Sequence, residues 1–134
     1  MASVFDTKWY ELITSQIARY LFAIPFIIFG VFQFMNGPEM ARNILVGWPA
    51  GTFLVYLTGA ALVGAGLSMI LRKYEKLATL LLGLMLLIFV FTLHLPAYVG
   101  AQEEMAKQFA MTSMLKDIAL AGGAFMASRL SNKL

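Results

Sequence analysis

The chain has 134 residues, of which 60% are apolar and only 13% are charged, and its formal net charge is +3. Soluble domains have roughly 25% charged residues, so this composition excludes an ordinary water-soluble enzyme and a disordered protein. The length predicts one domain, residues 1–134. The chain has no cysteine and one histidine. These counts exclude disulfides and thiolate chemistry, and we expect no metal site, since zinc needs about four ligands.

Four mostly apolar stretches follow one another along the chain, at residues 17–35, 52–71, 77–95 and 111–130. Each is long enough to cross about 30 Å of hydrocarbon as a helix. Backbone polar groups in lipid need partners within their own segment, and the alternation typical of barrel strands is absent, so helices are predicted. The sequence therefore predicts an all-α membrane protein: a bundle of four transmembrane helices with short interfacial helices.

Two segments outside these spans have the apolar spacing of interfacial helices. The first is predicted to lie on the inner membrane surface, through Phe5, Trp9, Leu12, Ile13 and Ile17. It contains acidic residues and lacks a small-residue cleavage site, so we do not expect a cleavable signal peptide. The second is predicted to lie on the outer surface, through Met40, Ile44 and Trp48. Pro96 is predicted to begin the last outer link.

Basic residues predict the orientation of the chain. With four spans both termini lie on one side, and that side has seven Lys and Arg residues: Lys8, Arg19, Arg72, Lys73, Lys76, Arg129 and Lys133. The other side has Arg42 and Lys107. The positive-inside rule then predicts cytoplasmic N- and C-termini in a cell inner membrane. We expect Arg19 to extend along the helix surface toward the headgroups, and the scattered basic residues predict no nucleic-acid partner.

Small residues at steps of four predict where the helices pack. In the second span these residues are Ala60, Gly64 and Ser68, and in the fourth they are Ala119, Gly123 and Ala127. We expect both faces to lie against protein.

The polar residues within the spans gather toward the outer half: Gln33, His94, Lys116 and Asp117, with Arg42 in the adjacent link. Neighbouring helix positions point about 100° apart, so Asp117 is expected to face inward, to Arg42 or His94. Lys116 would then extend to the outer surface or join the cluster. Three interpretations stay open: a structural ion-pair network, a pocket for a ligand such as a quinone headgroup, and a proton or ion path.

The chain resembles the DoxX family of small membrane proteins, from Arg19 to Ser128. The resemblance rests on Arg19 with Gly30, the glycine-rich stretch 59–67 followed by Arg72, His94-Leu95-Pro96, and the segment 116–123. The last is the most specific, because a charged pair leads directly into an apolar helix with two adjacent glycines. Gln33 stands where many members of the family have a lysine, and residues 61–63 lack the acidic residue that many members have.

The resemblance implies a four-helix membrane bundle and an association with quinone-linked redox systems. We expect an accessory or scaffold subunit that is not catalytic on its own, with the lipid bilayer, further copies of the chain, or other membrane and redox subunits as partners. No metal or flavin is expected, and a quinone is the one cofactor considered. The alternatives are a quinone-binding redox subunit, with the polar cluster around the headgroup, and a small transporter or membrane-protein assembly factor.

Overall fold

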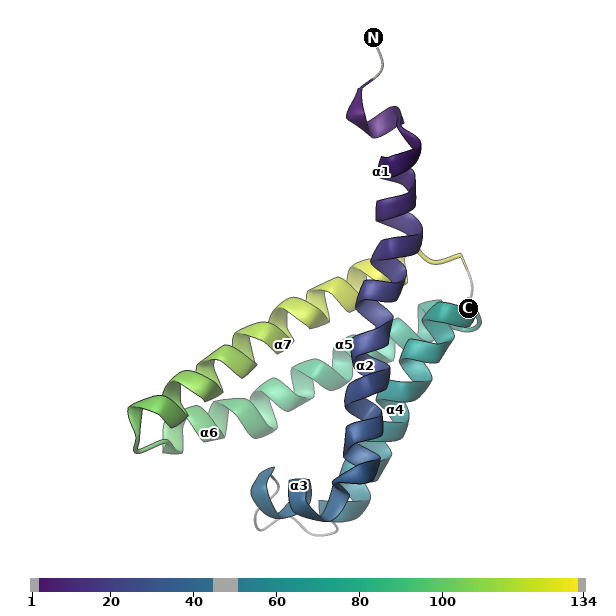
Figure 1. Cartoon of the computed structure of the whole chain (residues 1–134). Coiled ribbons are helices and arrows are strands. Elements are labelled where there is room, and N and C mark those ends of the chain that lie inside the picture. Colours follow the sequence, from purple (N-terminus) through teal and green to yellow (C-terminus); the bar gives the residue numbers. More distant parts are fainter. Residues whose placement is uncertain (1–2, 45–50, 133–134) are drawn as a thin grey trace.

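The computed structural model describes residues 3–44 and 51–132, which are helical almost throughout and contain no strand (Figure 1). The helices are η1 (Val4–Asp6), α1 (Lys8–Leu12), η2 (Ile13–Ile17), α2 (Ala18–Met35), α3 (Gly37–Ile44), α4 (Gly51–Leu71), α5 (Glu75–Phe89), η3 (Val90–His94), α6 (Leu95–Gly100) and α7 (Glu104–Leu130). Here η2 and η3 are π-helical turns inside longer helices. The prediction of an all-helical chain is confirmed for the described residues.

Three helices are long and apolar enough to cross a membrane, when the described residues are considered: Lys8–Met35, Gly51–Leu71 and Glu75–Gly100. They contain the first three predicted spans. The fourth predicted span lies in α7, which has 27 residues but a lower mean hydropathy, because Lys107, Lys116 and Asp117 interrupt its apolar sequence. Length and composition thus indicate a membrane protein.

The N-terminal segment is not a separate surface helix. It continues through η2 into α2 as one helix from Lys8 to Met35, and Figure 1 shows α1 projecting beyond the other helices. No glycine or proline stands between Lys8 and Ile24 to end the helix. Apolar side chains such as Trp9 are nevertheless exposed, as expected for an amphipathic segment.

The third spanning helix continues past Pro96, so the prediction that this residue begins the outer link is wrong. The helix ends only at Gly100. The turn before the proline widens: the Leu95 N–H donates to the Val90 carbonyl, five residues back. Proline has no N–H and clashes with the carbonyl four residues before it, and a wider turn before the proline gives this carbonyl more room.

The link between the first two candidate spans contains α3, which confirms the helix predicted around Met40. Gly37 and Ala41 are buried in it, whereas Glu39 and Arg42 are exposed. The predicted contribution of Trp48 lies outside the described residues.

The long helices pack as two antiparallel pairs, α2 with α4 and α5 with α7. Figure 1 shows the two pairs meeting at the end where α4 turns into α5 and diverging toward α3 and α6. We call the meeting point the closed end and the others the free ends. A shared apolar core between the pairs consists of Phe26, Leu62, Ala65, Leu82, Leu86, Ala121 and Ala124.

Glycine allows α2 and α4 to approach closely. A Cβ added at Gly30 would lie 2.6 Å from the carbonyl oxygen of Gly59, and one added at Gly59 would lie 3.1 Å from that of Gly30. Such contacts between small residues are how helices associate in lipid, where apolar burial gives little driving force.

The predicted packing faces of α4 and α7 lie against protein only in part: Ser68 is half-buried and a Cβ added at Gly123 would lie 3.0 Å from the Phe22 ring, but other predicted positions are exposed. In α4, Ala60 and Gly64 are exposed, and the buried small residues are Gly59, Ala65 and Gly66. In α7, Ala119 is exposed and Gly123 and Ala127 are half-buried, whereas the buried positions are Ala110, Asp117, Ala121, Ala124 and Ser128. Small residues lie on more than one face of each helix, so spacing alone did not identify the packed face.

A tight turn joins α4 to α5. Arg72 and Tyr74 have φ angles of 57° and 55°, in the left-handed region. The Lys73 N–H donates to the Ser68 carbonyl at 3.1 Å, which is the long hydrogen bond of a helix C-cap whose left-handed residue is usually glycine. The Ala78 N–H in turn donates to the Tyr74 carbonyl at 2.9 Å, so the turn is bonded to both helices.

The close approach of α2 and α4 predicts a position-specific effect of one methyl group. Gly30→Ala should lower the free energy of unfolding by about 1–3 kcal/mol, because the new Cβ meets backbone that cannot move without separating the helices. Gly122→Ala is the matched control, since nothing lies within 4 Å of its added Cβ. Unfolding in mixed detergent micelles measures both variants, and equal effects would contradict the packing described here.

Candidate functional site

We call each antiparallel helix pair an arm. His94 and Asp117 form a polar pair within the α5–α7 arm. His94 Nε2 lies 2.7 Å from Asp117 Oδ2, and the side chains retain 24% and 12% of their exposure. His94 is the last residue of the π turn, so the widened turn before Pro96 sets where the imidazole lies. Of the two partners expected for Asp117, the structure brings His94 to it.

The other two charged residues of the predicted cluster lie elsewhere. Lys116 is exposed, on a face of α7 that differs from that of Asp117. Arg42 is exposed near the end of α3 and forms no ion pair with the described residues. The structure therefore assembles a two-residue centre rather than one of five residues.

Gln33 forms a second polar pair on the α2–α4 arm. Its Nε2 donates to Thr58 Oγ1 at 3.0 Å, and Thr58 donates in turn to the Leu54 carbonyl at 2.9 Å. Gln33 is only 6% exposed, and its Oε1 has no hydrogen-bond partner among the described residues. Burying a hydrogen-bond acceptor without a donor costs free energy. A donor from outside the described residues that bonded to this oxygen would remove that cost.

The two pairs lie at a similar distance along their helices from the closed end. Gln33 comes 14 residues after Arg19, and Asp117 comes 14 residues before Ser131. At 1.5 Å per residue each lies about 21 Å along its helix from the closed end. Both pairs thus belong to the free halves of their arms.

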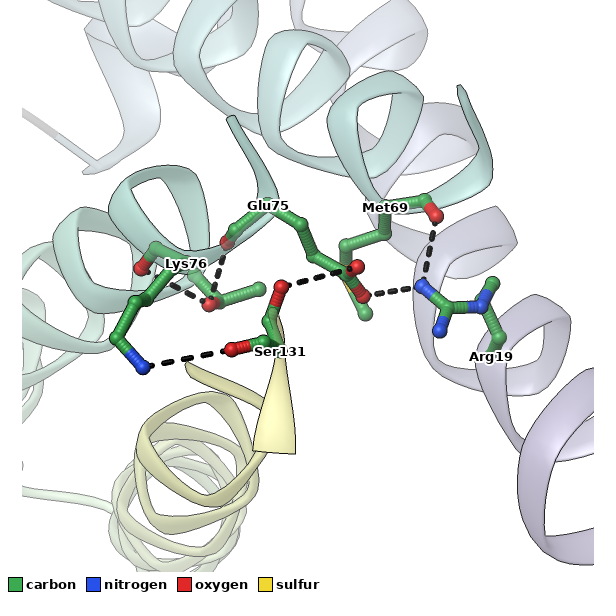
Figure 2. A network of polar contacts seen from close by, with 6 residues as sticks. Arg19, Met69, Glu75, Lys76 and Ser131 are labelled. Carbon is green, nitrogen blue, oxygen red and sulfur yellow. Dashed lines mark hydrogen bonds and ion pairs between the residues drawn. The ribbon is translucent and has the colours of Figure 1, made fainter. Parts of the chain in front are cut away.

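A more extensive polar network holds the closed end together, as Figure 2 shows. Arg19 of α2 forms an ion pair with Glu75 of α5, and its Nη1 also donates to the Met69 carbonyl of α4 at 2.9 Å. Ser131, after α7, donates through Oγ to the second oxygen of Glu75 at 3.2 Å. Groups from α2 and from the end of α7 therefore meet at one carboxylate of α5, which is 5% exposed, and α4 joins the network through Arg19.

Lys76 extends this network to the end of α7. Its Nζ donates to the carbonyls of Ser128 and Ser131 at 3.2 and 3.4 Å, and Ser128 Oγ donates back to the Lys76 carbonyl at 2.8 Å. The last carbonyls of a helix lack partners within the helix and carry partial negative charge. Lys76 satisfies them and attaches the C-terminus of α7 to α5.

Arg19 corrects a prediction. It was expected to extend along the surface toward the headgroups, but it lies half-buried against Glu75 because an unpaired carboxylate is available at the same depth. Sequence reasoning missed Glu75 altogether. The available signal was its place as the single acidic residue between Arg72, Lys73 and Lys76.

The described architecture defines an all-helical protein with three helices able to cross a membrane. Compared with protein-family models, with curated proteins and with solved structures, the chain matches none of them.

Breaking the closed-end ion pair should be strongly destabilising. Glu75→Ala leaves the Arg19 guanidinium half-buried without a counter-charge, and a loss of about 3–5 kcal/mol in the free energy of unfolding is expected. Glu39→Ala, at an exposed position in α3, is the control and should change little.

The double variant Arg19→Met with Glu75→Leu removes both charges and should recover most of the loss, because no charge is then left unpaired. Unfolding in mixed micelles tests all three proteins. A double variant as unstable as Glu75→Ala would show that the charges do not act as a pair.

Proposed function

We propose that the chain is an accessory or scaffold subunit of a larger membrane complex, in a quinone-linked redox system. The observation that supports this most is the His94–Asp117 pair, which stays partly exposed about 21 Å along α7 from the closed end. An ionisable pair facing hydrocarbon is costly. A subunit or ligand that covers the pair would remove that cost. Gln33 Oε1 on the other arm, which has no hydrogen-bond partner among the described residues, is also suited to accept a donor from a partner.

The proposal includes α7 as a fourth transmembrane helix in a four-helix bundle. Its support is that α7 has 27 residues, enough to cross about 30 Å, and packs against α5 through small residues. Four spans put both termini on the side of the closed end. The seven basic residues of that side then favour cytoplasmic termini in an inner membrane. The resemblance to the DoxX family supports the same arrangement.

A second candidate function is quinone binding at the His94–Asp117 centre itself. The carboxylate holds Nε2, and the other ring nitrogen, Nδ1, forms no hydrogen bond with residues 3–44 or 51–132. An imidazole oriented by a carboxylate can donate a hydrogen bond to a ligand oxygen or accept one from it. The centre is therefore suited to a quinone headgroup, whose carbonyl oxygens take up protons on reduction.

Native mass spectrometry of the protein, gently extracted from its own membrane, tests the leading proposal. A stable second subunit is expected. A homo-oligomer that retains only lipid would contradict the proposal and favour transport or a purely structural role.

Asp117→Asn separates the two candidate functions. If the centre binds a quinone, the variant should lose a quinone-sized adduct while its melting temperature stays within a few degrees of that of the wild type. If the pair is only structural, the variant should melt earlier and the wild type should show no such adduct. Glu104→Gln, at an exposed position in the first turn of α7, is the control for the loss of one carboxylate.

A further inference from the structure

A groove runs along the outside of the contact between α4 and α5. Its volume is about 250 Å³, and its walls are small or apolar, with Ala61 and Gly64 on α4 and Leu81 and Met85 on α5. Nothing lies within 4 Å of a Cβ built on Gly64. Both walls belong to helices long and apolar enough to span a membrane, so the groove is aligned with the acyl chains of the surrounding lipid.

The groove ends at the turn between the two helices. Ser68 and Ala78 line this end, and both are hydrogen-bonded to the turn: Ser68 accepts from the Lys73 N–H, and the Ala78 N–H donates to Tyr74. The turn joins two candidate spans, so in either orientation it lies at a membrane surface. The apolar groove therefore ends at headgroup level.

Two cations at this end are unused. Arg72 and Lys73 are exposed, and neither side chain forms a hydrogen bond or ion pair with any residue that the structure describes. The neighbouring cations differ: Arg19 is paired with Glu75, and Lys76 binds carbonyls of the α7 terminus. Arg72 has a left-handed backbone conformation that ends α4, so both Arg72 and Lys73 belong to the short turn and not to a helix.

We propose that this groove binds one anionic phospholipid, with an acyl chain between α4 and α5 and the phosphate at Arg72 and Lys73. Charge complementarity supports this occupant, because a basic site between transmembrane helices suits an anionic headgroup. A second copy of the chain suits the groove less well. Packing α4 against its own copy in the same membrane orientation would bring the two basic turns together.

Lipid titration followed by native mass spectrometry tests the headgroup site. Purified protein in detergent is titrated with phosphatidylglycerol and, separately, with phosphatidylcholine. One phosphatidylglycerol per chain should be retained in preference to phosphatidylcholine. The double variant Arg72→Gln with Lys73→Gln should weaken phosphatidylglycerol binding by about thirtyfold, since each cation near an anionic headgroup contributes about fivefold.

The matched control is the double variant Lys8→Gln with Arg129→Gln. It removes the same charge from two other exposed positions that form no side-chain hydrogen bond or ion pair among the described residues. It should leave the affinity within about twofold. Equal weakening by the two double variants would overturn the proposal, because the attraction would then be a property of net charge alone.

A second pair of variants tests the groove without touching charge. Gly64→Leu places a side chain in the groove, and Gly122→Leu places the same side chain on α7, outside it; neither Cβ meets an atom within 4 Å, so both should fold. Gly64→Leu should lower phosphatidylglycerol occupancy at least tenfold, and Gly122→Leu should not. Equal occupancy in the two variants would overturn the acyl-chain site. A change from oligomer to monomer in Gly64→Leu, with lipid occupancy unchanged, would assign the groove to a second copy instead.

Discussion

The ion pair between Arg19 and Glu75 is the constraint on which the arrangement of the helices depends. Neither charge can be left alone in a half-buried setting near the membrane, and the two belong to different helix pairs. Satisfying them brings α2 to the start of α5. The same carboxylate and guanidinium also bind Ser131 and the Met69 carbonyl, so the ends of α4 and α7 are fixed by the same interaction.

Away from this end each arm satisfies its polar groups separately. Gln33 bonds to Thr58 within the α2–α4 pair, and His94 bonds to Asp117 within the α5–α7 pair. The apolar core joins the arms through small residues and a few large ones, among them Leu62 at 1% exposure. The protein is thus anchored at one end and divided at the other, and among the described residues a buried side-chain atom without a hydrogen-bond partner lies in each part: Arg19 Nε at the closed end and Gln33 Oε1 in the α2–α4 pair.

The sequence was sufficient to predict where the helices lie in the chain, but not which face of each helix packs against protein. Helices are required wherever long apolar segments meet lipid, so the first three spans were predictable from composition. The packed face of α4 was not, because nearly all its residues are apolar and Ala60, Gly64 and Gly66 offer small residues in several directions. In a water-soluble protein, polar residues identify the solvent-facing side of a helix. A helix that faces lipid lacks these polar residues, so its outward side cannot be recognised in this way.

The candidate site was predictable only in part, for a related reason. Asp117 could be placed inward because adjacent Lys116 needed a different direction, and His94 was one of its two expected partners. The pairing of Gln33 with Thr58 depends on the register between α2 and α4, which glycine contacts determine. Glu75 could not be predicted as a buried ion-pair residue for two reasons. It stands among basic residues in the sequence, and its partner Arg19 is 56 residues away in the chain.

The unequal lengths of the helices connect the shape of the protein to the thickness of its bilayer. At 1.5 Å per residue α4 is about 31 Å long and matches a hydrocarbon layer of about 30 Å, whereas the helix from Glu75 to Gly100 is about 39 Å long. The longer helix exceeds the same layer, and helices of excess length are accommodated by tilting, kinking or local thickening of the bilayer. Because the two arms diverge in Figure 1, α4 and α5 cannot both lie along the normal of one bilayer, so a bilayer that both helices cross holds at least one of them tilted.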